Sequence, residues 1–171
     1  MTDVSNIQKT RLDTASNEHL TALAAAGAAA FGYTSTLKLD NKLAQLLRLR
    51  VSQINNCTYC LTVHHAAARA AGIPQAQVDT LSAWWETQLF TDAERAALAY
   101  AESLTRLADT TVAERFQQVH DELAFHFAED VLIEIVGVVV NMNIWTRLKL
   151  AEGAMPTPEV PAAKARPTRF N

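Results

Sequence analysis

Two cysteines and a histidine are spaced so that their side chains fall on one side of a single helix. Cys57 and Cys60 are the only cysteines of the chain, and His64 follows four residues after the second of them. Each residue of an α-helix advances by about 100° and about 1.5 Å, so the three side chains share a face, with His64 roughly 6 Å from Cys60 and roughly 10 Å from Cys57 along the axis. The imidazole can therefore exchange a proton with Cys60 more easily than with Cys57.

The position of Cys57 gives it a different advantage. We expect this residue at the N-terminus of its helix, where unpaired backbone N–H groups and the helix dipole favour a thiolate. Such a pair can cycle between dithiol and disulfide, because one thiolate attacks a peroxide or a disulfide and the other thiol resolves the product. In a reducing compartment, a lone Cys-x-x-Cys indicates redox or metal chemistry over a structural disulfide.

The same spacing also fits a purely structural or a metal-binding role. The two cysteines could simply belong to a helical core. A c-type haem site is excluded, because the residue after the second cysteine is Leu61 and not histidine. A zinc site could take both cysteines and His64, with a distant His120 or His126 as fourth ligand, but structural zinc pairs usually lie in a knuckle and not inside a helix. We therefore expect neither a metal nor an organic cofactor.

Composition bounds the kind of protein that carries the motif. The chain has 171 residues, of which 49% are apolar and 19% charged, with a net charge of −3. One domain of this size can bury a core, and the charge does not favour a nucleic-acid partner. Residues 1–6 lack the basic and apolar regions of a secretory signal, so we expect a cytoplasmic protein. The apolar run 131–140 is interrupted by Glu134 and is too short for a membrane span.

The elements that must position the cysteines are predicted to be helices throughout, which makes the fold class all-α. Four of the five prolines lie after residue 155, and no segment alternates like a strand. Capping boxes mark two helix starts, Thr91-x-x-Glu94 and Thr111-x-x-Glu114. The predicted helices cover 18–31, 40–56 with Asp40 as cap, 57–71, a short stretch after Pro74, 93–107, 113–123 and 129–151. Residues 16–151 then form one domain, and 152–171 form a Pro-containing tail.

A longer segment around the motif resembles a known family. Residues 46–60 read LLRLRVSQINNCTYC, and His64 and the sequence ARAAG at 68–72 follow. Farther on, Trp84, FTDAERAAL at 90–98 and NIWTR at 143–147 look like the second half of the same pattern. Over residues 16–151 the chain thus resembles the AhpD-like alkylhydroperoxidase branch of the carboxymuconolactone decarboxylase family.

The resemblance implies a helical bundle with a redox helical hairpin, assembly into trimers or hexamers, and thiol-dependent peroxidase or disulfide-reductase activity. Carried over residue by residue, Cys60 would attack the peroxide, Cys57 would resolve the product and later meet the reductant, and His64 would relay the proton. Members of the decarboxylase branch that act on a lactone lack the cysteine pair, so the pair favours the redox branch.

Two positions depart from the peroxidase pattern. Twelve residues before the first cysteine, where the pattern has glutamate, this chain has Gln45, and between the cysteines, where histidine is common, it has Tyr59. Gln45 cannot accept a proton, so a relay from glutamate through His64 to the thiol would be cut at its far end. Gln45 would then only orient His64, which we expect it to face across the hairpin.

The sequence therefore predicts a homo-oligomeric enzyme that reduces hydroperoxides through a disulfide between Cys57 and Cys60, which an external dithiol or thiol protein reopens. Two alternatives stay open at this point: a redox sensor or binding module with slow chemistry, and a non-redox enzyme of the decarboxylase kind. Assembly is also favoured by the shallow Ala-rich surface of residues 18–31 and by the aromatic residues Trp84, Trp85 and Trp145 as candidate contacts.

Overall fold

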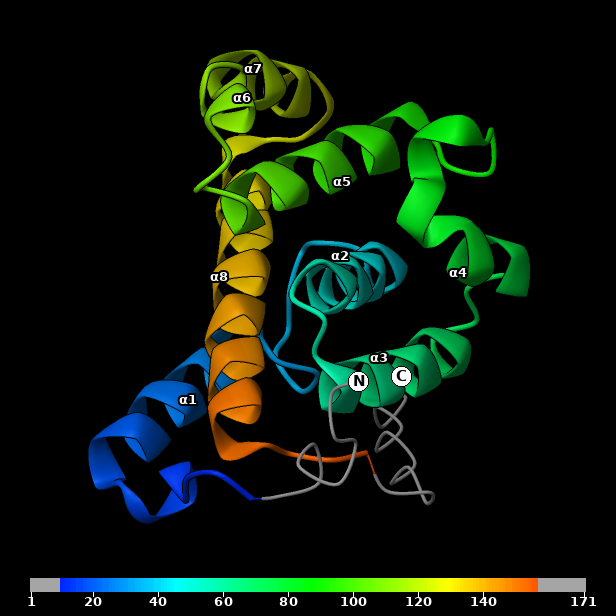
Figure 1. Ribbon diagram of the computed structural model, residues 1–171. Helices are drawn as coiled ribbons and strands as arrows, with labels where there is room; N and C mark the ends of the chain where they lie inside the picture. The colour runs from blue at the N-terminus through cyan, green and yellow to red at the C-terminus, as the bar shows by residue number, and fades with distance from the viewer. Residues whose placement is uncertain (1–9, 157–171) are drawn as a thin grey trace, which may run out of the picture.

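Helix α2 (Asn41–Ile54) is the helix around which the others are arranged. In the computed structural model, which describes residues 10–156, it lies at the centre of the view in Figure 1, with α3 (Thr58–Ala70), α5 (Asp92–Thr105) and α8 (Glu129–Glu152) around it. All residues from Leu43 to Ser52 are buried. A helix that is buried on every side is a core helix, which explains why this one can carry the buried side chains of a site.

The remaining elements complete an all-helical fold. No strand occurs among residues 10–156, so the all-α prediction is confirmed. The other elements are η2 (Thr14–Ser16), α1 (Glu18–Phe31), α4 (Gln75–Thr80), η3 (Leu81–Glu86), α6 (Thr110–Ala113) and α7 (Phe116–His126). The tail predicted for 152–171 lies outside the described residues from position 157 onward.

Most helix ends lie close to their predicted positions because local signals set them. Asp40 caps α2 by accepting the backbone N–H of Lys42 and Leu43, and the predicted capping box of Thr91 and Glu94 starts α5. Helix α8 ends at Gly153, which takes φ +66°, the left-handed conformation that glycine adopts without strain.

The predicted helix 113–123 is wrong at its start. Asp109 accepts the backbone N–H and the hydroxyl of Thr111, so a separate short helix, α6, forms at Thr110–Ala113. The next helix, α7, begins at Phe116 with no side-chain cap. The threonine that was expected to cap a helix therefore hydrogen-bonds to the aspartate before it.

The stretch after Pro74 also differs from the prediction of one short helix. Helix α4 ends at Thr80, and a 3₁₀ segment, η3, carries the two adjacent tryptophans.

Helices α1 and α8 approach each other closely through a pair of glycines. A Cβ atom on Gly27 of α1 would meet Oδ1 of Asn141 at 2.5 Å, and a Cβ atom on Gly137 of α8 would meet the ring of Phe31 at 2.3 Å. Each helix thus offers one glycine to a side chain of the other. By length and composition α8 could cross a membrane, although the sequence predicts that the apolar run 131–140 within it is too short for that. One third of its apolar stretch is buried, and the helix packs against α1, α2 and α5.

Candidate active site

The two cysteines lie where α3 begins. Cys57 is the N-cap residue of α3, and its Sγ accepts the backbone N–H of Cys60 at 3.3 Å. The two residues form a disulfide, with 5.2 Å between their Cα atoms, and only 1% and 3% of their surfaces are exposed. The sulfur of Cys57 therefore lies at the helix N-terminus, where the sequence placed it and where backbone N–H groups favour negative charge.

The turn before α3 is held by contacts to other helices. Asn56 takes φ +51° and reverses the chain between α2 and α3. Asn55 donates from Nδ2 to the backbone oxygen of Val51 and to Oδ1 of Asn143 on α8, both at 3.1 Å. The position of Cys57 is thereby fixed relative to both α2 and α8.

His64 is buried one turn beyond Cys60 and contacts a residue that sequence reasoning missed. The hydroxyl oxygen of Tyr33, from the loop after α1, lies 2.8 Å from Nδ1 of His64, and the two rings stack with centroids 5.4 Å apart. Burial, and to a lesser extent the charge of Arg48, lowers the pKa of His64 to about 3. The imidazole is therefore neutral at physiological pH.

The phenol of Tyr33 is held protonated. Burial raises its pKa above the ordinary value, although the nearby guanidinium of Arg48 acts in the opposite direction. A protonated phenol can donate to a bare ring nitrogen or accept from a protonated one. Tyr33 can therefore serve either tautomer of His64.

Arg48 is the second missed residue, and it is a buried cation. Only 3% of its surface is exposed. Its Nη2 donates to the backbone oxygens of Phe31 at 2.8 Å and Gly32 at 3.2 Å, and its guanidinium lies over the ring of Tyr33 at 5.3 Å. Within residues 10–156 it has no ion-pair partner. Burial lowers its pKa to about 10, so it remains charged at neutral pH.

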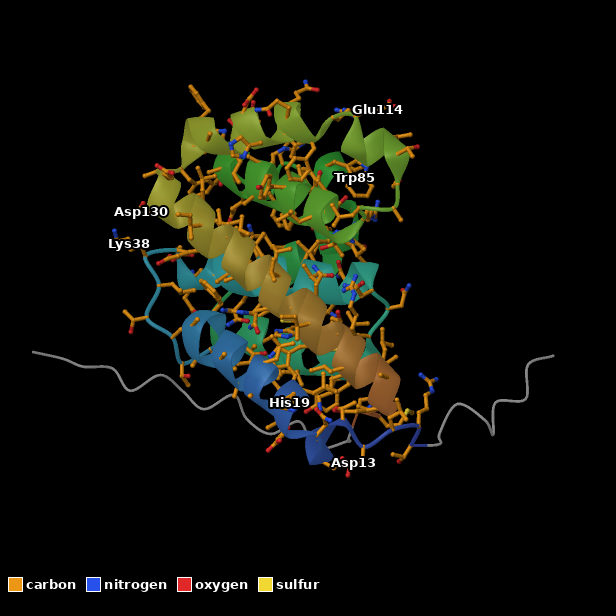
Figure 2. The ribbon with its side chains drawn as sticks, turned by 90° about the vertical axis from the view of Figure 1, so that its left-hand side faces the viewer. Asp13, His19, Lys38, Trp85, Glu114 and Asp130 are labelled. Atoms are coloured by element: carbon orange, nitrogen blue, oxygen red, sulfur yellow. A yellow bond between two sulfur atoms is a disulfide. The ribbon has the colours of Figure 1, made fainter. Side chains whose placement is uncertain are left out.

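The loop that carries Tyr33 is tied to the start of α8. The carboxylate of Glu134 accepts the backbone N–H groups of Lys38 at 3.1 Å and Leu39 at 2.7 Å. The ammonium group of Lys38 also pairs with Asp130, which lies beside it at the edge of the molecule in Figure 2. These contacts hold the second half of the loop, while the carbonyl groups bound by Arg48 hold the first half.

A cavity of about 460 Å³ adjoins this constellation. Side chains of α2, α3 and α8 line it together with the end of α1. The lining residues are Ala28, Gly32, Tyr33, Thr34, Arg48, Tyr59, Cys60, Val63, His64, Asn141, Met142, Trp145 and Lys149. Cys60 is among them and Cys57 is not. Access from the cavity therefore favours Cys60 as the sulfur that meets a small molecule.

The two positions that depart from the peroxidase pattern lie apart from each other. Tyr59 lines the cavity, with the ammonium group of Lys149 at 5.3 Å from its ring centroid. Gln45 is buried on α2, outside the cavity lining, and its Oε1 has no hydrogen-bond partner within the described part of the chain. It makes no hydrogen bond to His64, whose Nδ1 faces Tyr33 instead. The orienting role expected of Gln45 stays a prediction.

The other histidines lie elsewhere. His120 and His126 belong to α7, which Figure 1 shows at the opposite end of the molecule from α3. His126 contacts Glu122 at 3.3 Å, and His120 packs near Tyr100. They do not join the cysteines as distant zinc ligands. Across residues 10–156, no group of three or more His, Cys, Asp or Glu is placed to hold a metal.

Comparison with known proteins places the chain in a family. The sequence pattern of the carboxymuconolactone decarboxylase family matches residues 17–103, just over half of the chain. The chain belongs to this family. It is 27% identical over 121 residues to the uncharacterized protein YdfG of Bacillus subtilis, a match that covers 71% of this chain and 80% of the relative. The matched region contains the cysteines, His64 and Arg48.

Solved structures of similar fold carry names that point to different chemistry. A protein of unknown function from Agrobacterium tumefaciens, named as a candidate antioxidant defence protein AhpD, has a TM-score of 0.78 at 24% identity and covers 88% of this chain and 100% of its own. The debrominase Bmp8 in complex with 2,3,4-tribromopyrrole has a TM-score of 0.70 at 18% identity and covers 84% and 74%. At these identities the likeness establishes the AhpD-like fold, and the chemistry must be argued from the site.

Proposed function

We propose that the protein is a thiol-dependent peroxidase that reduces organic hydroperoxides through Cys57 and Cys60. The observation that carries the proposal is the disulfide between these residues, with Cys60 at the wall of a cavity and His64 one turn away on the same helix. A hydroperoxide needs a thiolate that can reach it, a second thiol to resolve the product and a group that moves protons. All three are present.

The cycle balances with one external dithiol. The thiolate of Cys60 attacks an oxygen of ROOH, the O–O bond breaks, ROH leaves with a proton, and Cys60 becomes a sulfenic acid. The thiol of Cys57 attacks that sulfur, which forms the disulfide and releases water. An external dithiol then reduces the disulfide and leaves as its own disulfide. The sum is ROOH plus a dithiol giving ROH, water and a disulfide.

His64 acts in this cycle as a relay for the proton and not as a store for it. A neutral imidazole can accept the proton of the Cys60 thiol and pass it to the departing alkoxide. Burial and the charge of Arg48 disfavour the imidazolium form of His64. The ring therefore passes the proton on and does not keep it. Arg48 lines the same cavity as Cys60 and stays charged at neutral pH, and a positive charge in this wall favours the developing thiolate.

The test follows the two thiols separately. Reduced protein treated with one equivalent of cumene hydroperoxide should lose both free thiols and gain an internal disulfide, observed by thiol titration and intact mass. Cys57→Ser should stop at a sulfenic acid that a cyclic dione traps, whereas Cys60→Ser should keep its thiol. Catalytic consumption of peroxide should need added dithiol. A disulfide that forms once without turnover would identify a redox sensor. Persistence of both thiols in millimolar peroxide would refute the proposed peroxidase activity.

We further propose a cytoplasmic homo-oligomer, a trimer or hexamer, that takes its electrons from a dithiol or thiol protein. Support comes from exposed apolar side chains on α1 and α8, among them Leu23, Ile133 and Val140. The three tryptophans support assembly less than the sequence suggested. Trp84 donates to Glu102 inside the protomer and Trp145 lines the cavity, which leaves Trp85, 47% exposed, as a contact. Sedimentation analysis of the purified chain tests the assembly.

A further inference from the structure

The cavity beside Cys60 is much larger than the smallest peroxide requires. A water molecule takes about 30 Å³ in the liquid, and hydrogen peroxide roughly twice that, whereas the cavity measures about 460 Å³. Pockets that bind organic ligands are of about 300–1,000 Å³. The volume therefore fits an organic hydroperoxide with a carbon skeleton of drug-like size.

The walls of the cavity are suited to an apolar or aromatic skeleton. Tyr33, Tyr59, Met142 and Trp145 line it. These side chains offer flat or polarisable surfaces without charge. Such walls gain from burying a ring or an alkyl chain.

The charge in the wall has one sign. Arg48 and Lys149 line the cavity, and none of the lining residues is an aspartate or glutamate. Lys149 already has a counter-ion, because its Nζ donates to Glu152 at 2.6 Å. Arg48 has only the two backbone oxygens bound by Nη2, so its Nη1 and Nε make no hydrogen bond within the described residues. A buried guanidinium without a carboxylate is costly unless a ligand supplies the anion.

A second polar group in the wall also lacks a partner. Asn141 is buried, and its Oδ1 makes no hydrogen bond in the described part of the chain. Gly27 leaves just enough room for this amide against α1. The free acceptor of Asn141 thus lies against α1, and the unused donors beside the redox sulfur of Cys60 are those of the Arg48 cation.

We propose that the cavity takes an organic hydroperoxide that carries a carboxylate, with the carboxylate bound by Arg48 and the peroxide group at Cys60. This inference rests on the proposed peroxidase activity and adds the substrate class. Guanidinium forms strong charge-assisted N–H···O bonds to carboxylate, and Nη1 of Arg48 has donors that no other group within the described residues uses. The anion completes the ion pair that the protein leaves open.

Two matched hydroperoxides test the preference for charge. Cumene hydroperoxide and its para-carboxylate share the reacting group and differ in the anion. The carboxylate should have a kcat/KM about 10- to 100-fold higher, the range expected for a hydrogen bond to a charged group. Arg48→Met should bring the ratio close to one, and Arg48→Lys should keep part of it. Arg69→Met, an exposed arginine of α3 outside the cavity lining, is the control and should leave the ratio unchanged.

A binding measurement separates this inference from the peroxidase proposal. The oxidised protein should bind 4-isopropylbenzoate at least tenfold more tightly than the neutral 4-isopropylbenzamide by calorimetry, with the difference lost in Arg48→Met. If peroxidase turnover is absent but this preference holds, the anion site is correct and the reaction is wrong. Equal rates for the two hydroperoxides together with equal binding of acid and amide would overturn the anion site. The unsubstituted protein decides this comparison even if Arg48→Met fails to fold.

Discussion

The hydroxyl oxygen of Tyr33 lies 2.8 Å from Nδ1 of His64, although 31 positions separate the two residues in the sequence. Tyr33 reaches this place from the loop after α1, and His64 from the middle of α3. The same oxygen lies 3.4 Å from Nε2, so the phenol faces the edge of the ring between its two nitrogens. The orientation of the imidazole, and not only its presence, is thus fixed from outside the helix that carries the cysteines.

Removing the Tyr33 hydroxyl should slow the chemistry with little loss of fold. In Tyr33→Phe the ring still stacks on His64 and still lies beneath Arg48, but the imidazole loses the bond that orients it. We expect the oxidation of Cys60 by peroxide to slow by about 10- to 100-fold, less than the loss of about 10²- to 10⁴-fold for a general base that is removed, because the imidazole is still present. Stopped-flow fluorescence of the reduced protein measures this rate.

The control for this change is Tyr100→Phe. Tyr100 is a buried tyrosine of α5, and its ring contacts Phe116 and His120 instead of the site. Its substitution should leave the oxidation rate within about twofold, since surface and core changes away from the site act on stability and not on the reaction. Equal rates for the parent and Tyr33→Phe would show that Tyr33 only packs.

The stability of the protein should fall in mild acid because of His64. Its pKa of about 3 in the folded protein lies below the ordinary value of about 6.5. Between these values the unfolded chain binds a proton that the folded protein does not, so the free energy of unfolding falls as the pH drops from about 6.5 toward 3, by up to about 1.4 kcal/mol per pH unit. His64→Gln removes this contribution.

Urea unfolding of the oxidised protein at pH 7.5 and pH 5 measures the effect. The parent should lose more stability between the two values than His64→Gln. His19→Gln, which changes an exposed histidine of α1, should behave like the parent. A parent curve as flat as that of His64→Gln would mean that the imidazole takes up its proton inside the folded protein.

Placing a carboxylate at position 45 should raise the reactivity of Cys60. Gln45 is buried on α2, one turn before Arg48. Glutamate there would offset the positive charge that lowers the pKa of His64, so the imidazole should become a stronger base and the thiol should react faster. We expect Gln45→Glu to consume peroxide several-fold faster than the parent, and the gain should vanish when His64→Ala is added.

A new buried carboxylate also has a cost, so a melting curve accompanies each rate. Gln53→Glu adds a carboxylate at the far end of the same helix, where Gln53 contacts Arg50 and not the cavity, and it should give no gain. A Gln45→Glu protein that melts like the parent and reacts no faster would show that no proton path runs through position 45.

The contact between α1 and α8 should not tolerate one added methyl group. In Gly137→Ala the new Cβ would meet the ring of Phe31. Overpacking costs about 1–3 kcal/mol, more than the helix propensity of about 1 kcal/mol that alanine gains over glycine. We expect net destabilisation in thermal unfolding, and rescue when Phe31→Val is added. Lack of rescue would place the strain elsewhere.

The redox motif could be predicted from sequence because one helix carries all of it. Cys57, Cys60 and His64 are local to α3, so helix geometry alone puts them on one face. Tyr33 and Arg48 come from the loop after α1 and from α2, and no periodicity signals which polar residue of one element will meet another. Arg48 gave one signal, as a charged residue in the run LLRLR, which in a helix buried on all sides must place its cation in the interior.

The helix boundaries show the same division between local and distant causes. Asp40, Thr91 and Gly153 act within a few residues of themselves, and the predicted ends agree with the structure there. The start predicted by Thr111 and Glu114 was wrong because Asp109 competes for the same threonine. Two capping residues within one turn offer two possible starts, and the pattern alone does not rank them.

The paired glycines of α1 and α8 set the register between the two helices. Gly27 and Phe31 are four residues apart on α1, and Gly137 and Asn141 are four residues apart on α8. The two helices run antiparallel, so that Gly27 faces Asn141 and Gly137 faces Phe31. Sliding α1 by one helical turn, about 5.4 Å, would break both contacts at once. Tyr33 follows α1 by two residues and would move with it, away from His64. Helix α1, which carries no cysteine, therefore determines the position of Tyr33 in the redox site. Small substitutions at its contact with α8 should change the reaction rate although they lie outside the site.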